Sequence, residues 1–207
     1  MKLARLPRGQ WALIGTLLLA VAAANIAQPY PDLAPLQHAP TVLLCILAPC
    51  LLRRWPLSTS AVALLWLFLM LHTLGGRYIY SYVPYQGWLA ADGGEAVGGL
   101  LGEARNGYDR FVHFMFGLLF TPVLAEIAQR HAGLGRRASW LVSFAMIGLG
   151  SALYEVFEWL LTVVAAGETA DYYNGQQGDV WDPQKDMALA QLGSLIAWGL
   201  GRLQKPV

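Results

Sequence analysis

Charge is scarce in this sequence. Only 13% of the 207 residues are charged, whereas an ordinary soluble domain carries about 25%. The 14 Lys and Arg nearly balance the 13 Asp and Glu, which leaves a net charge of +1. That balance gives no reason to propose a nucleic-acid partner.

Cysteine is also rare, which excludes a disulfide scaffold. The two cysteines, Cys45 and Cys50, lie in one apolar block. On a helix their spacing points them to different faces, so we expect no disulfide between them. Complete zinc-protease, P-loop and Ser-His-Asp patterns are absent, and so are internal repeats.

Long apolar blocks dominate instead, and 56% of the residues are hydrophobic. Blocks of this length predict an all-α polytopic membrane protein with about six transmembrane helices in one bundle, embedded in a lipid bilayer. We expect a single membrane domain over residues 1–207. The expected spans are 11–27, 39–54, 57–74, 108–128, 139–166 and 183–203.

The first block has two interpretations. A basic start, an apolar run and the small residues 22–24 are also typical of a signal peptide. Because five more apolar blocks follow, we favour a retained first transmembrane helix. The sequence leaves open whether residues 1–27 are cleaved.

Positive charge predicts the orientation. Six spans place both termini on one side, and ten Lys and Arg fall on that side against four on the other, which predicts cytoplasmic termini. The first set is Lys2, Arg5, Arg8, Arg53, Arg54, Arg130, Arg136, Arg137, Arg202 and Lys205, and the second is Arg77, Arg105, Arg110 and Lys185.

Ionisable residues then gather at the outer ends of four spans, and only Glu126 among the acids lies near the inner face. Such groups are costly within a membrane and usually serve a function there. We therefore predict one acidic and histidine-containing site near the outer face. Its candidates are His72, Asp109, His113, Glu155, Glu158, Asp182 and Asp186.

Asp109 and His113 are four residues apart and share a helix face. Such a pair can hold one metal ion, or the carboxylate can orient the imidazole. The structural alternative makes Asn106 the N-cap and Asp109 a first-turn carboxylate at N3 that suits the helix dipole. His113 would then be a hydrogen-bonded core residue.

Glu155 and Glu158 also share a face, since they are three residues apart. Neighbouring carboxylates repel, so a proton or a bridging cation would have to compensate them. The alternative is a pair of salt bridges to Arg77, Arg105 or Arg110.

Asp182 precedes Pro183, which is a typical N-cap and N1 pair, so it has a structural explanation. Asp186 lies one turn further along the same face and is not needed for capping, which makes it the better ligand candidate. His72 alone is equally well explained as a core histidine.

Small and aromatic residues give two further expectations. Gly148, Gly150 and Ser151 in the fifth span would let a neighbouring helix approach closely. The tyrosine-rich stretch 77–85 is expected in the lipid headgroup zone.

Three segments together resemble the YjdF-type family of bacterial inner-membrane proteins, namely YDRFVHF at 108–114, YEVFEW at 154–159 and GDVWDPQKDM at 178–187. The resemblance implies a multi-pass protein of the bacterial inner membrane. The function of that family is unknown, so the resemblance supplies no reaction.

Three functions fit the predicted site. The first is a metal-dependent enzyme in which the seven candidates hold Mn, Mg, Fe or Zn, with Glu155 and Glu158 as catalytic groups and a lipid or small molecule at the periplasmic face as substrate. The second is a small-solute or proton-coupled transporter. The third is a structural or assembly protein with an outer salt-bridge network. The sequence does not decide between them, and it leaves the oligomeric state open.

Overall fold

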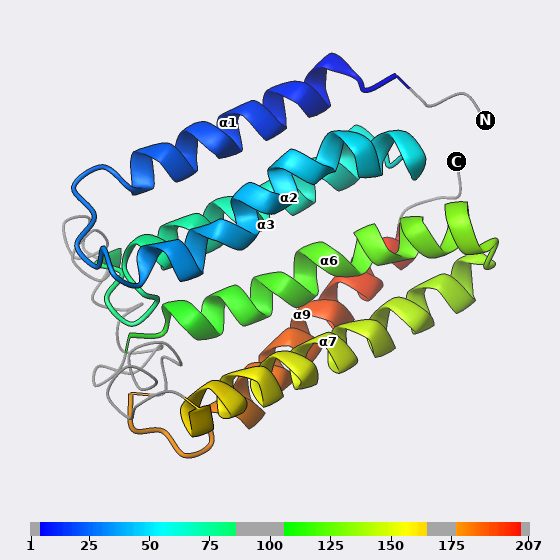
Figure 1. The fold of residues 1–207 in the computed structure, drawn as a ribbon. Coiled ribbons are helices and arrows are strands. Elements are labelled where there is room, and N and C mark those ends of the chain that lie inside the picture. Colours follow the sequence, from blue (N-terminus) through cyan, green and yellow to red (C-terminus); the bar gives the residue numbers. More distant parts are fainter. Residues whose placement is uncertain (1–4, 86–105, 165–176, 204–207) are drawn as a thin grey trace, which may run out of the picture.

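The computed structural model describes residues 5–85, 106–164 and 177–203 (Figure 1). These residues form helices and turns without a β-strand, which confirms the all-α prediction. In chain order the helices are α1 (Arg8–Ala24), α2 (Ala34–Arg54), α3 (Thr59–Arg77), α6 (Tyr108–Ala132), α7 (Arg136–Val164) and α9 (Asp182–Leu203).

Four of these helices, α2, α3, α6 and α7, are long and apolar enough to cross a membrane. Helix α1 is apolar but shorter, with 17 residues. Helix α9 is not among the four; its first turns carry Asp182, Lys185 and Asp186, and it packs against α6 and α7. The polytopic architecture expected from the apolar blocks is confirmed.

The helix boundaries differ from the predicted ones mainly at α2, α6 and α7. Helix α2 begins at Ala34, five residues before the predicted start, because Pro35 sits in its first turn, where proline costs no hydrogen bond. Helix α6 continues to Ala132 and ends at Gly133, which adopts the left-handed conformation that favours glycine. Helix α7 is described to Val164, and the predicted end of this span at 166 lies outside the described residues.

The helices form two halves, one of α1, α2 and α3 and the other of α6, α7 and α9, joined chiefly by the contact of α3 with α6 (Figure 1). The start of α1 and the end of α9 lie at the same end of the bundle, here called the terminal end. The opposite end, where α6 and α9 begin, is here called the acidic end.

Glu126 ties the two halves together toward the terminal end. Its carboxylate accepts hydrogen bonds from the Ser58 backbone N–H and hydroxyl, both at 2.6 Å, and pairs with Arg130 Nε at 3.0 Å. Hydrogen bonds to a charged group contribute about 1.5–3 kcal/mol. Glu126 therefore has a structural role, fixing the start of α3 on α6.

Helices α6 and α9 run parallel with their backbones in close contact. A Cβ on Gly117 would lie 1.8 Å from the Ala190 carbonyl oxygen, and one on Gly193 would lie 2.1 Å from the Phe114 carbonyl oxygen. One turn further, the Thr121 hydroxyl is hydrogen-bonded to Ser194 at 2.7 Å. Small residues of this kind are what allow helices to approach closely in membranes.

Of the two glycines expected to allow close packing on α7, only Gly148 lies against a neighbouring helix too closely for a side chain. A Cβ on Gly148 would meet the Gln191 amide nitrogen at 2.2 Å, so α9 does approach closely there. At Gly150 the nearest atom is 3.4 Å away on the Phe116 ring, which is ordinary contact. The closest backbone approach is between α6 and α9.

We predict that Gly193→Ala destabilises the fold by about 1–3 kcal/mol, because the added methyl group overpacks the contact with α6. Gly199→Ala on the same helix is the matched control, since a Cβ there meets nothing within 4 Å. The control should be neutral or stabilise by up to about 1 kcal/mol. Thermal unfolding of the purified variants in one detergent measures both, and equal effects would contradict the close α6–α9 packing.

Candidate functional site

Three of the predicted residues meet at the acidic end. Asp109 and His113 lie in the first turns of α6, Asp186 lies in the second turn of α9, and all three are buried. One ligand atom from each lies within 4.8 Å of the other two. The pairing of α6 with α9 thus brings Asp186 to the helix face that Asp109 and His113 share.

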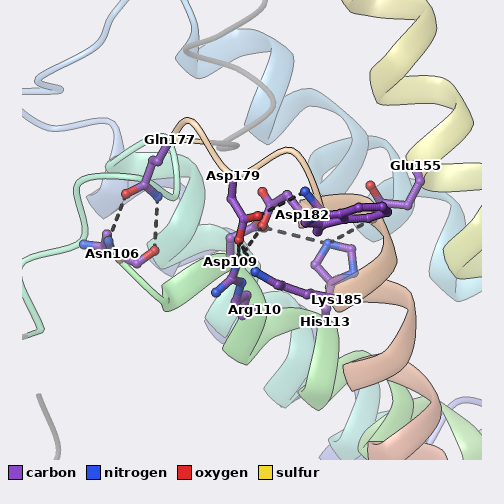
Figure 2. A network of polar contacts seen from close by, with 10 residues as sticks. Asn106, Asp109, Arg110, His113, Glu155, Gln177, Asp179, Asp182 and Lys185 are labelled. Carbon is purple, nitrogen blue, oxygen red and sulfur yellow. Dashed lines mark hydrogen bonds and ion pairs between the residues drawn. The ribbon is translucent and has the colours of Figure 1, made fainter. Parts of the chain in front are cut away.

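His113 stands at the centre of this group. Its Nε2 atom is 3.8 Å from Asp109 Oδ1 and 3.7 Å from Glu155 Oε1 on α7 (Figure 2). Both distances are too long for a hydrogen bond. The 3.8 Å between His113 and Asp109 would fit two ligands that each lie about 2.0–2.2 Å from one shared ion. The donor set of one imidazole and several carboxylates also suits a divalent metal.

Glu155 faces the same group with an unsatisfied oxygen. The residue is buried, and Oε1 has no hydrogen-bond partner among the described residues. A buried polar atom without a partner costs about 1–3 kcal/mol. Its position therefore suits an added ligand, proton or ion. Glu158 is buried on the same face of α7.

The start of α6 differs by one residue from the expected cap. Gly107 is the N-cap, and the Asn106 side chain accepts a hydrogen bond from the Tyr108 N–H at 3.1 Å. Asp109 therefore occupies N2 instead of N3, still within the first turn, where the helix dipole favours a carboxylate. Asn106 also exchanges two hydrogen bonds with the Gln177 amide, at 2.9 and 3.1 Å, which attaches the segment before α9 to the start of α6 (Figure 2).

Asp182 is paired with Arg110. Its Oδ1 accepts from Arg110 Nη2 at 3.1 Å, and the same nitrogen contacts Asp179. The expected N-cap role shifts to Trp181, whose carbonyl accepts the first helical hydrogen bond from the Lys185 N–H at 3.0 Å. Asp182 is thus a first-turn carboxylate paired with an arginine.

Arg110, Asp179 and Lys185 form an ion cluster at the edge of the site (Figure 2). The hydrogen bond from Lys185 lowers the pKa of Asp179, and those from the Trp181 N–H at 3.0 Å and from Arg110 act in the same direction. Asp179 precedes α9, so it lies outside the helical spans.

This lowered pKa has a defined pH consequence. A carboxylate whose folded pKa lies below its unfolded value stabilises the fold above the unfolded pKa, and this contribution is lost as pH falls through the folded value. We predict that the melting temperature falls from about pH 5 toward pH 3, and less steeply in Asp179→Asn. Thermal unfolding across this range is the measurement, with the exposed Asp32→Asn as control. Identical slopes in Asp179→Asn and wild type would contradict the cluster.

The arginines proposed as salt-bridge partners of the glutamates are engaged elsewhere. Arg77 donates to the carbonyl oxygens of Ala24 and Ile26, at 2.6 and 2.9 Å, and Arg110 binds the two aspartates. Arg105 lies outside the described residues. Glu155 instead lies beside His113.

His72 belongs to a separate network on α3. Its Nε2 is 3.0 Å from the Gln37 carbonyl oxygen, and its Nδ1 is hydrogen-bonded to the Tyr80 hydroxyl. Because both ring nitrogens are used, His72 offers none to the group around His113 in this conformation.

Tyr80 is the residue that sequence analysis did not single out. The backbone at Ile79 and Tyr80 is left-handed, with φ of 44° and 58°, a rare conformation for a β-branched residue. A Cβ on Gly75 would lie 2.7 Å from the Tyr80 ring. The expected headgroup position for this stretch does not fit Tyr80, which is 8% exposed and turned inward. Its only sequence signal was the glycine pair 75–76 that precedes the tyrosines.

The two networks face one cavity of about 380 Å³. The polar groups come from α2, α3, the turn after α3, α6 and α7, and the remaining wall is largely apolar. The polar lining residues are Thr41, His72, Tyr80, Asp109, His113, Ser151 and Tyr154, and the apolar ones include Leu44, Phe68, Leu69, Val112 and Phe116.

The fold and this site define a polytopic helical membrane protein with a buried acidic group at one end of its bundle. Residues 9–206 match the family model described as "Predicted membrane protein (DUF2238)". The chain is 35% identical over 163 residues to the inner membrane protein YjdF of Escherichia coli (strain K12), across 77% of this chain and 73% of that protein. The chain belongs to this family and is a multi-pass protein of the bacterial inner membrane. No solved structure matches it.

Proposed function

We propose that the protein is a metal-dependent enzyme acting on a membrane lipid at the acidic end of the bundle. One observation carries the proposal: Asp109, His113 and Asp186 place buried ligand atoms within 4.8 Å of one another in or beside the wall of a cavity that is otherwise largely apolar. Buried ionisable groups in a membrane are costly and call for such a role.

In this proposal Asp109, His113 and Asp186 hold the ion. Their donors are one imidazole nitrogen and two carboxylates, a set that can bind Mn, Fe, Zn or Mg. A divalent ion at this position supplies Lewis-acid chemistry and favours a nucleophilic water. Glu155, 3.7 Å from His113, is placed to accept a proton from such a water. Glu158 is a candidate for the return of that proton to the leaving group, because it shares the buried face of α7.

The shape of the cavity supports a lipid substrate. Its polar groups lie toward the acidic end and its apolar wall extends inward along α2, α3 and α6. A molecule with a polar head and an apolar chain meets both requirements. A phosphoryl or acyl ester at the head would carry the bond that is broken.

Metal analysis of the purified protein tests the proposal. We expect bound divalent metal in wild type. In His113→Ala and Asp186→Asn the affinity for Mn²⁺ or Zn²⁺ should fall by at least about 10- to 100-fold, the loss typical for residues that only support a ligand. Asp32→Asn, which removes an exposed carboxylate before α2, is the control and should bind as wild type. A wild-type protein that binds none of these metals would exclude the metal-dependent enzyme.

Glu155→Gln separates catalysis from binding. The variant keeps the size of the side chain and all three proposed ligands, so metal content should be close to that of wild type. Hydrolysis of a lipid ester in nanodiscs should fall by about 100-fold or more, the usual contribution of a general base. The structural alternative predicts lower melting temperatures for Glu155→Gln and Glu158→Ala, together with unchanged turnover.

Transport is the second candidate, and one observation favours it. Buried hydroxyl groups follow the site inward along α7 at Ser151, Ser143 and Ser139, next to Gln191 on α9. The Ser151 hydroxyl has no hydrogen-bond partner among the described residues and is therefore available to a passing solute, whereas Ser143 and Ser139 donate to nearby backbone carbonyl oxygens. Proton flux into proteoliposomes that is lost in Glu155→Gln would support transport over catalysis.

A further inference from the structure

A second cavity continues from the one at the site. It has a volume of about 450 Å³ and is lined almost entirely by apolar side chains of α1, α2 and α3, with Ile127 and His131 of α6. Leu44 and Leu69 line both cavities, so these residues mark their junction. The two cavities therefore adjoin, with the polar groups concentrated in the first.

The two cavities together are longer than the hydrocarbon layer of one membrane leaflet. Along α2 they extend from Pro40, which lines the first cavity, to Leu52, which lines the second. Twelve helical steps correspond to about 18 Å at 1.5 Å each. Half of a bilayer hydrocarbon core is about 15 Å thick. The path can therefore take an extended chain of ordinary or greater lipid length.

The first cavity has α2 on one side and α7 on the other, with α3 and α6 between them. Within the described residues α2 and α7 are not packed extensively against each other. The space between them is therefore accessible sideways from the membrane, where the abundant apolar molecules are lipids. Exposed leucines on α2, such as Leu43 at 57%, mark this side as lipid-facing.

We propose that the two cavities together form a lipid-binding crevice that holds one long-chain lipid. The polar head lies at Asp109 and His113, and the chain passes Leu44 and Leu69 and ends among the side chains near Trp55. This inference rests on the proposed function for what happens at the head, and it names the substrate class as a long-chain lipid ester.

Photocrosslinking tests the path of the chain. The probe is a phospholipid with a photoactivatable group at the end of one chain, added to the full-length protein in nanodiscs. We expect crosslinks to residues of the second cavity, such as Leu17, Leu52 and Trp66. Labelling confined to the outward surfaces of α2 and α7 would overturn the proposal.

Leu44→Trp tests the junction, because the larger ring would block the passage. Crosslinking in the second cavity should fall by about tenfold, the change that an overpacking penalty of about 1.4 kcal/mol gives. Leu43→Trp is the matched control, because Leu43 precedes Leu44 on α2 and lines neither cavity. Equal labelling in both variants would overturn a chain that passes Leu44.

Metal content of the same samples separates this inference from the proposed function. If wild type binds metal but its chain probe labels only the outer surfaces, the crevice is overturned and the metal site stands. If the probe labels the second cavity and wild type binds no metal, the enzyme is excluded and the crevice stands. Leu44→Trp should retain the metal, because Leu44 is not among the proposed ligands.

Discussion

The close approach of α6 and α9 is the constraint on which the rest of the structure depends. Gly117 and Gly193 let the two backbones meet, and the parallel direction of the helices then places Asp186 beside His113. A Cβ at either glycine would overlap the backbone of the other helix. The Thr121–Ser194 hydrogen bond adds to the stability of this close contact.

The sequence was sufficient to predict the helices, which the structure confirms, whereas the common depth of the polar residues in the membrane stays a prediction. Both depend on local patterns, since an apolar run fixes a span and the position of an acid within that run fixes its depth. The grouping of Asp109, His113 and Asp186 agrees with that depth. Which helices adjoin depends on contacts between distant segments, and glycine spacing alone did not identify the α6–α9 pair.

Contacts between distant segments also explain why Asp182 and His72 do not join Asp109, His113 and Asp186. Asp182 and Asp186 share a helix face, yet Arg110 binds only the first, which depends on the position of α6. His72 lies at the predicted depth, but Gln37 and Tyr80 occupy its nitrogens. The inward turn of Tyr80 needs left-handed backbone at Ile79 and Tyr80, which non-glycine sequences rarely signal.

Arg110 divides the acidic residues at this end of the bundle into those that pair with it and those that lie near His113. It pairs with Asp179 and Asp182, and Lys185 also pairs with Asp179, whereas Asp109, Asp186 and Glu155 lie near the imidazole of His113. Buried carboxylates this close together repel, so a cation, a proton or a hydrogen-bond donor has to compensate them. The proposed divalent ion would balance this charge and would fit the 3.8 Å between His113 and Asp109, which is too long for a hydrogen bond. Protonation alone would balance the charge but gives no reason for three carboxylates from three helices to gather around one imidazole.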